Sequence, residues 1–380
     1  MAFRVLIARD RDQLSRVAAD VAREVLRQCL AARETPVLGL ATGQSPLGLY
    51  RHLAEAARRG EWNVQRVQTF NLDDYVGLPG ATPEARARHP QGCAAAMARN
   101  FFDLLPAPPR GIHIPAAARV DATLLEQELR AHPEDWRESG AGPGKAISIR
   151  PDARSAYLRW IRTDILDAYG RDIERAGGID LQIIGVGENG HVAFHEAGIP
   201  FASDPVLLVR LEANTIHNAI VDGHFPSVAE SPRHAVSMGA ALVFRARSVL
   251  LLAAGARKAP VLAAAFTGAP VSAKPISPRV RAARRRHGRR LGSRGRRRHP
   301  RPPERDRGAR HRHRGTLRSP RGRRIGPASQ PTSFRSASAM ETHSRATNSS
   351  RGPSTITRQR FCVPEYRTNT RPSRPSSRSA

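Results

Sequence analysis

The stretch from residue 180 to residue 196 reads DLQIIGVGENGHVAFHE. It begins with a short apolar run, Leu181 to Ile184, which follows two glycines and predicts a buried strand. Three further glycines come next, Gly185, Gly187 and Gly190. Glycine lets the backbone approach a ligand closely and adopt a positive φ, and ligands of open α/β sheets bind at the carboxyl ends of the strands. We therefore expect this loop to line a binding site.

Three polar side chains occupy the same loop, namely Asn189, His191 and Glu196. An amide, an imidazole and a carboxylate can together hold a polyhydroxy substrate and move protons on it near neutral pH. The alternative is a structural turn whose histidine caps a helix and whose glutamate is solvated, and the spacing alone leaves both open. The G-x-G-x-x-G spacing is also a weak dinucleotide signal, which we discount because it lies deep in the chain rather than in a first βαβ unit.

A second loop has the pattern of an anion site. Residues 36–41, PVLGLA, predict a buried strand, and Thr42, Gly43, Gln44, Ser45 and Pro46 lead from it into a helix over residues 47–58. Free backbone N–H groups and the helix dipole favour a phosphate at such a helix start, and the two hydroxyls add donors. The alternative is a plain N-cap by the serine with the proline at the first helical position, and both can hold at once.

Two further places carry charged groups at strand ends. Residues 67–70 predict a strand that leads to the adjacent carboxylates of Asp73 and Asp74, and such a pair at a strand end is often a solvated loop or a helix cap. Residues 248–253 predict another strand, and Lys258 follows it at a helix start. A lysine there suits phosphate binding, although a surface lysine is the common alternative.

The net charge of +29 suggests a nucleic-acid partner, but its distribution argues against one. Residues 279–380 hold 30 arginines against four acidic residues, which leaves +3 for residues 1–278. Three scattered cysteines indicate a reducing compartment without a disulfide framework or a zinc site. Residues 4–8 predict a first strand rather than a signal peptide, and no apolar run reaches the length of a membrane span. We expect a cytoplasmic protein without membrane or specific nucleic-acid partners.

Three separated motifs now combine. The stretches TGQSP (42–46), FNLDDYVG (70–77) and GVGENGHVAFHE (185–196) resemble the glucosamine-6-phosphate deaminase/isomerase family, which shares its fold with 6-phosphogluconolactonase. The resemblance covers about residues 3–278. It implies a single doubly wound α/β domain with a mostly parallel sheet and helices on both faces. The lactonases usually continue their loop into a Ser-Leu-Phe pattern, which this chain lacks at residues 193–196.

The resemblance also implies a reaction, in which glucosamine 6-phosphate and water give fructose 6-phosphate and ammonia. Asp73 aligns with the base that moves a proton between C2 and C1, and Asp74 orients its loop. His191 aligns with the acid/base that opens the ring, and Asn189 and Glu196 hold that imidazole. The residues aligned with phosphate binding are Thr42, Gly43, Gln44, Ser45 and Lys258, and the supporting glycines are Gly187 and Gly190.

No metal or organic cofactor is implied, the partner is a small-molecule sugar phosphate, and a homo-oligomer is allowed. Two positions depart from the family pattern. Ile216 stands where a phosphate-binding arginine is common, and His195 stands where asparagine is usual. A missing guanidinium weakens phosphate binding or signals another amino-sugar phosphate. A 6-phosphogluconolactonase-like hydrolase and a non-catalytic sugar-phosphate-binding protein remain the alternatives.

Two segments lie outside this pattern. Residues 121–152 are charged and rich in glycine and proline, and they predict a flexible insertion longer than the family normally carries there. Residues 279–380 have no apolar periodicity and predict a disordered basic tail. The change of composition in the middle of a motif favours translation in the wrong reading frame. An evolved arginine-rich tail that binds RNA or membranes is the alternative.

Overall fold

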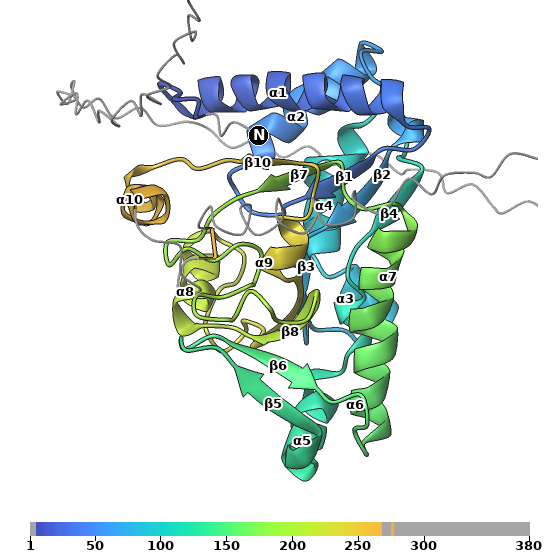
Figure 1. Ribbon diagram of the computed structural model, residues 1–380, viewed down its shortest axis with the longest axis vertical. Helices are drawn as coiled ribbons and strands as arrows, with labels where there is room; N and C mark the ends of the chain where they lie inside the picture. The colour runs from blue at the N-terminus through green and yellow to red at the C-terminus, as the bar shows by residue number, and fades with distance from the viewer. Residues whose placement is uncertain (1–4, 268–274, 277–380) are drawn as a thin grey trace, which may run out of the picture. The chain divides into compact units, whose positions relative to one another are not determined.

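A computed structural model describes residues 5–267 and 275–276 of the chain. Five strands of this part form a sheet in the order β10, β7, β1, β2, β4 (Figure 1). In that order they span Ser248–Leu251, Leu181–Ile184, Val37–Leu40, Gln68–Asn71 and Gly111–His113. All four strand pairs are parallel. The loops that follow β1, β2, β7 and β10 therefore leave the sheet at the same edge.

Helices cover both faces of this sheet. Leu38 and Leu40 of β1 pack in one buried cluster with α1 (Arg11–Ala32) and α2 (Leu47–Arg58). Val37 points to the opposite face, where a second cluster includes α7 (Asp167–Arg175). Successive side chains of a strand alternate between faces, so a strand that is apolar throughout must be covered on both. The predicted α/β fold with a parallel sheet between helices is confirmed.

A second sheet has the order β3, β9, β8, β6, β5 and is antiparallel throughout. The sequence analysis predicted one mostly parallel sheet and did not separate these strands from it. These strands span Asp73–Val76, His234–Met238, Val206–Arg210, Lys145–Ile149 and Trp136–Ser139. A buried run of four or five residues does not reveal the direction of its partner. The prediction therefore had no means of separating these strands from the parallel ones.

Residues 121–152, predicted as a flexible insertion, contain regular structure. They form α5 (Ala122–Ala131), β5 and β6. Strand β6 pairs with β5 on one side and with β8 on the other, and Ile147 and Ile149 are buried in the core. The three glycines of this segment and one of its three prolines gather in the turn between the two strands, at residues 140–144.

The predicted first strand is absent from the described residues 5–8. Val5, Leu6 and Ile7 are 61%, 50% and 78% exposed. An apolar run forms a strand only where a neighbouring strand offers its hydrogen-bonding groups. The expectation was wrong for these residues, and Arg4 lies outside the described part of the chain.

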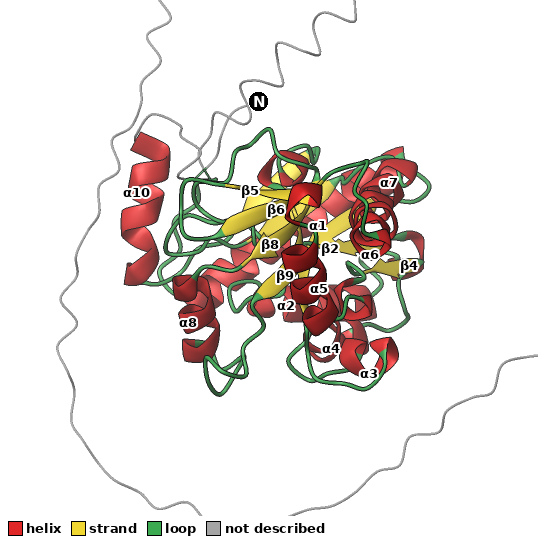
Figure 2. Cartoon of the chain, turned by 90° about the horizontal axis from the view of Figure 1, so that it is seen from below, coloured by secondary structure: helices red, strands yellow, loops and turns green. Residues whose placement is uncertain are grey.

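The predicted helix at residues 47–58 is confirmed as α2. A longer helix runs from α6 (Ala156–Trp160) through a π-helical segment, Ile161–Leu166, into α7. Figure 2 shows α6 and α7 on one side of the strands and α8 and α10 on the other. The remaining helices are α3 (Pro83–Ala87), α4 (Cys93–Asn100), α8 (Ala213–Val221), α9 (Ala240–Val243) and α10 (Ala259–Thr267).

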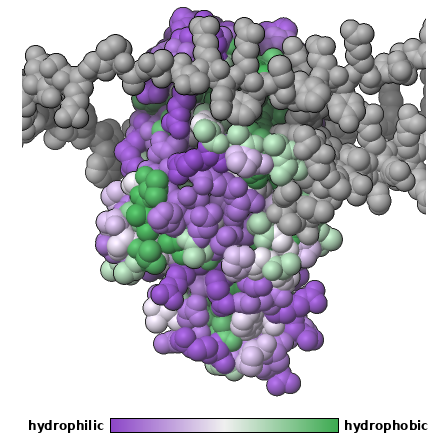
Figure 3. Space-filling view, turned by 90° about the vertical axis from the view of Figure 1, so that its left-hand side faces the viewer, coloured by the Kyte–Doolittle hydropathy of each residue, from purple (hydrophilic) through white to green (hydrophobic). Residues whose placement is uncertain are grey.

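Among the described residues, no helix combines the length and the apolar character needed to cross a membrane. The face drawn in Figure 3 is largely hydrophilic, with apolar residues gathered in small groups. The predicted basic tail, residues 279–380, lies outside the described residues.

Candidate active site

A pocket of about 320 Å³ lies where the loops after β1, β2, β7 and β10 leave the parallel sheet, and α8 forms one of its walls. That volume lies within the usual range for small-molecule sites. The predicted site residues that line it are Thr42, Gly43, Gln44, Ser45, Asp73, Gly187, His191 and Lys258. The other predicted residues, Asp74, Asn189, Gly190 and Glu196, lie outside this lining. The structure thus divides the prediction into pocket-lining groups and groups set behind them.

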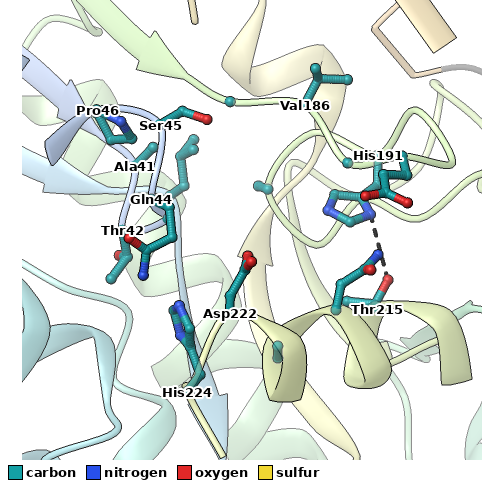
Figure 4. Close-up of a pocket in the computed structure, with 18 of the residues that line it drawn as sticks. Ala41, Thr42, Gln44, Ser45, Pro46, Val186, His191, Thr215, Asp222 and His224 are labelled. Carbon is teal, nitrogen blue, oxygen red and sulfur yellow. Dashed lines mark hydrogen bonds between the residues drawn. The ribbon is translucent and has the colours of Figure 1, made fainter. Parts of the chain in front are cut away.

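Tyr50 of α2 fixes the start of the loop after β1 through two hydrogen bonds. The Tyr50 hydroxyl donates to the Ala41 carbonyl oxygen at 2.7 Å and accepts from the Ala41 N–H at 3.0 Å. Pro46 is the N-cap residue of α2, and no side chain caps the helix. The alternative that Ser45 caps this helix is therefore wrong. Its side chain lies in the pocket wall with Thr42 and Gln44, across from His191 (Figure 4).

Three cations also line the pocket. Lys258 follows β10 and is half-buried, and burial lowers the pKa of its ammonium group. Arg257 lies beside it and pairs with Glu188 at 3.1 Å, which joins the loop after β10 to the loop after β7. Arg11, at the start of α1, also reaches the lining. These cations and the start of α2 give the pocket positive charge that suits an anion.

Asp73 lies where the chain passes from the parallel sheet to the antiparallel sheet. Leu72 donates its N–H to Leu40 of β1 at 2.9 Å and accepts from the N–H of Met238 in β9 at 2.8 Å. Asp73, the next residue, is 8% exposed. Burial and then the charge of Asp74 raise the pKa of Asp73 to about 7. A carboxyl group with that pKa can take up and return a proton near neutral pH.

Asp74 faces away from the pocket and holds the backbone. Its carboxylate accepts from the N–H of Tyr75 at 2.8 Å and from the N–H of Cys93, the first residue of α4, at 3.0 Å. Burial raises the pKa of Asp74 to about 6, and the two N–H donors oppose that rise. The Cys93 thiol also lies 3.8 Å from the Asp73 carboxylate. The pair of carboxylates is thus fixed by α4, which is distant in sequence.

The loop after β7 is a tight turn that presents His191. The N–H of Gly187 donates to the His191 carbonyl oxygen at 3.0 Å, and Gly190 has a φ of 92°. A Cβ atom added to Gly187 would lie 2.2 Å from the His191 ring. Both glycines are therefore required by the turn itself, as well as by any ligand above it.

Behind His191 lies a buried polar group. The Nδ1 atom of His191 is 3.6 Å from Oε2 of Glu196, which is fully buried. The Asn189 amide donates to Glu196 at 3.2 Å and to Glu212 at 2.7 Å, and its oxygen accepts from the His191 N–H at 3.1 Å. The N–H of Glu212 donates to the other Glu196 oxygen at 3.2 Å. The glutamate is thus fixed from several sides.

The protonation of His191 follows from these neighbours. Burial lowers the pKa of its imidazole, the Glu196 carboxylate opposes that effect, and the Lys258 charge adds to it. The ring is then neutral near pH 7 and can accept a proton. The Thr215 hydroxyl on α8 lies 3.5 Å from its Nδ1 atom (Figure 4).

The two residues that depart from the family pattern are not part of the pocket lining. His195 is buried, with its Nε2 atom 3.0 Å from the Ile199 carbonyl oxygen and its Nδ1 atom accepting from the Ala240 N–H at 3.0 Å. Burial lowers its pKa to about 4. Ile216 packs against an apolar cluster that contains Tyr75. Both side chains support the walls of the pocket.

The sequence analysis missed four groups around the site, and each depends on contacts between distant segments. They are Cys93, Glu212, Thr215 and Arg257. Only Arg257 carried a local signal, because it precedes the predicted lysine. The fold and the pocket define an α/β protein in which the loop at the start of a helix shares a pocket with a buried aspartate and a histidine.

Comparisons with known proteins show the family of this chain. A family model described as "Glucosamine-6-phosphate isomerases/6-phosphogluconolactonase" matches residues 9–288, and the chain belongs to this family. The glucosamine-6-phosphate deaminase of Thermoanaerobacter sp. (strain X514) is 31% identical over 269 residues, 70% of this chain and 84% of the relative. The enzyme of that name from Hahella chejuensis (strain KCTC 2396) is 33% identical over 274 residues, 71% of this chain and 82% of the relative.

A solved structure of a monomeric glucosamine-6-phosphate deaminase has a TM-score of 0.54 to this chain at 24% identity, covering 72% of this chain and 91% of that chain. At this identity the likeness supports the fold. The family match ends beyond residue 278, where the sequence analysis placed the end of the domain.

Proposed function

We propose that the chain converts glucosamine 6-phosphate and water to fructose 6-phosphate and ammonia. The observation that carries this proposal is the presence of Asp73 and His191 in the same pocket, beside the loop at the start of α2. An isomerisation with ring opening needs two separate proton-transfer groups, and a phosphosugar needs an anion site. The names of the relatives support the amino sugar as substrate.

The phosphate would lie at the loop of Thr42, Gly43, Gln44 and Ser45, with Lys258 completing its charge. Backbone N–H groups at a helix start hold phosphate without side-chain rearrangement. Arg257 and Arg11 line the same pocket. They supply positive charge in the absence of the arginine that the family pattern has at residue 216.

Ring opening is the role of His191. A neutral imidazole can take the proton from the anomeric hydroxyl at O1 and deliver one to the ring oxygen O5, so that the C1–O5 bond breaks and the aldehyde forms. The Glu196 carboxylate lies 3.6 Å from the ring and stabilises the imidazolium while it carries the proton. Asn189 and Glu212 hold that carboxylate in place.

Isomerisation is the role of Asp73. Its carboxylate removes the proton from C2 while the aldehyde oxygen O1 takes up a proton from water, which gives an enolamine. Asp73 then returns its proton to C1, and the electron pair of the amino nitrogen forms a protonated imine at C2. Water adds to the imine, the C–N bond breaks, and ammonia leaves with the ketose phosphate as the other product. The burial that raises the pKa of Asp73 to about 7 suits a group that both accepts and returns a proton.

Ammonia release from glucosamine 6-phosphate by the purified chain tests the proposal, and glucosamine without phosphate and glucose 6-phosphate are its controls. Release from the phosphorylated amino sugar alone is the expected result. Hydrolysis of 6-phosphogluconolactone without ammonia release would favour the lactonase chemistry that the family also contains. Tight binding of the sugar phosphate without turnover would leave a non-catalytic binding protein.

A further inference from the structure

The turn between β5 and β6, residues 140–144, lies against the chain that follows Glu196. We propose that this turn positions Glu196, and that Gly144 is the residue through which it does so. The proposal rests on the proposed function, because it gives Glu196 its role beside His191. It assigns a task to the segment that the sequence analysis took for an insertion.

The backbones of the turn and of residues 197–198 are in direct contact. The N–H of Ala141 donates to the Gly198 carbonyl oxygen at 3.1 Å. A Cβ atom added to Gly142 would lie 2.2 Å from the Ala197 carbonyl oxygen, and one added to Gly198 would lie 2.5 Å from the Gly142 nitrogen. Glycines on both sides therefore allow two backbones to meet with no side chain between them.

Gly144 makes the contact with the glutamate itself. An added Cβ atom would lie 2.5 Å from Cγ, 2.6 Å from Cβ and 3.1 Å from Cδ of Glu196. Gly144 is not among the glycines with a positive φ. Alanine is therefore compatible with the backbone at this position, and the three heavy atoms nearest to its methyl group would all belong to Glu196.

The carboxylate has little room to move elsewhere. Glu196 is fully buried, accepts from Asn189 and from the N–H of Glu212, and lies beside His191. A methyl group at residue 144 would push it from one side while Glu212 holds it from the other. The distance between the glutamate and the imidazole would then change.

The turn is itself anchored to the second sheet. The Lys145 ammonium donates to the Gly140 carbonyl oxygen at 2.8 Å. In the antiparallel pairing of β6 with β8, the backbone of Lys145 lies opposite that of Arg210. Arg210 also forms an ion pair with Glu138 on β5. Strand β8 leads directly to Glu212, so the same sheet carries both walls that enclose Glu196.

Gly144→Ala tests the role of the turn, with Arg137→Ala as its matched control, since Arg137 lies exposed on β5 of the same hairpin. We expect kcat for ammonia release to fall about 10- to 100-fold in Gly144→Ala while KM changes less than about 3-fold, because small displacements at a reacting group cost that much. The control should retain the kinetics of the unchanged chain. Unchanged kcat in Gly144→Ala would overturn the proposal.

A second readout does not depend on turnover. The pKa of His191, measured by NMR titration of ¹⁵N-labelled histidine and assigned with His191→Gln, should shift in Gly144→Ala. Glu196 and Lys258 are the charges that act on this ring, and Glu212 reaches it through Asn189. A displaced Glu196 supports the imidazolium less, so the pKa should fall. A shift without any ammonia release from the unchanged chain would support the positioning and refute the proposed reaction.

The double variant Gly144→Ala/Glu196→Asp separates contact from general damage to the fold. Aspartate keeps the Cβ and Cγ atoms that the added methyl group would meet, but it is one methylene shorter, so its carboxylate already lies farther from His191 before the methyl group is added. If the turn acts through Glu196, Gly144→Ala should lower kcat less than about 3-fold in the Glu196→Asp background, since contacting residues are not additive. Equal losses of kcat in both backgrounds would overturn the proposal.

Discussion

The two ends of the pocket are built in different ways. The proposed phosphate end consists of Thr42 to Ser45, consecutive residues at a helix start whose Gly43 and Gln44 are exposed, together with a half-buried Lys258. The proposed acid–base end consists of Asp73 and of His191 and Glu196 in the loop after β7, and these three side chains are largely buried. Local backbone geometry makes the loop of the first end, whereas contacts between segments fix the buried groups of the second.

This difference follows from what each end must do. A phosphate is bound by any helix start with free N–H groups, so a short motif is sufficient. An acid or base must have its pKa moved towards neutrality, and that requires burial and fixed neighbours. Changes at the acid–base end should therefore act on kcat or on folding, and changes at the phosphate end should act mainly on KM.

Asp73→Asn should have the largest effect. The amide keeps the shape of the side chain but cannot take a proton, so kcat for ammonia release should fall about 10³-fold, within the range for a general base. Steady-state kinetics measure the change. Substrate binding, measured by calorimetry, should stay within about 3-fold because the phosphate end is untouched. A variant that retains a tenth of the activity would exclude Asp73 as the base.

His195→Ala tests whether the acid–base end depends on a buried support. Removing this ring leaves the Ile199 carbonyl oxygen and the Ala240 N–H without their partner. The free energy of unfolding should fall by about 2–4 kcal/mol, because each buried unpaired group costs about 1–3 kcal/mol. Urea unfolding measures it.

His191→Ala is the control for that substitution, since the two histidines lie four residues apart in the same loop. It should abolish ammonia release while the free energy of unfolding changes by less than about 1 kcal/mol. The opposite pattern, with His195→Ala stable and inactive, would show that the chemistry belongs to His195 and not to His191.

Lys258→Ala should act at the phosphate end. Losing a charged donor to phosphate costs about 1.5–3 kcal/mol, so KM for the sugar phosphate should rise about 30-fold while kcat changes little. Arg257→Gln is the comparison, because Arg257 is paired with Glu188 in the structure. Its KM should rise less. A fall in kcat at constant KM in Lys258→Ala would place the lysine near the reacting carbons.

The contrast between the two ends also explains what the sequence could predict. Apolar runs and glycines are local signals. They predicted β1 and β7 and the loop at Thr42–Ser45. The motifs also led to Asp73 and His191, which line the same pocket. These are the features that a stretch of fewer than about twenty residues can encode by itself.

What the sequence did not reveal depends on pairing. The antiparallel sheet, the order in residues 121–152 and the place of Glu212 beside Asn189 all require knowledge of which segments meet. The exposed residues 5–7 show the converse, because an apolar run without a pairing strand forms no strand. A pattern of single residues carries little information on contacts between distant ones.

The pH dependence is the smallest of the expected effects and separates the two carboxylates. Burial and the charge of Asp74 raise the pKa of Asp73 from 3.8 to about 7. The base form therefore appears as pH rises, and kcat should increase through pH 7. Asp74→Asn removes the neighbouring charge and should move the midpoint of that rise to lower pH. A midpoint that stays in place would mean that burial alone sets it.

The same shift predicts how stability changes with pH. Because the folded pKa of Asp73 lies above its unfolded value, the folded state binds more protons between about pH 4 and pH 7. The stability that this raised pKa contributes to the folded state is complete below about pH 4 and is lost as the pH rises through about 7. The difference in the free energy of unfolding between Asp73→Asn and the unchanged chain should therefore shift in favour of the variant from pH 5 to pH 8. A difference independent of pH would mean that Asp73 is already ionised in the folded state at pH 5, and that it acts as a base only through its position.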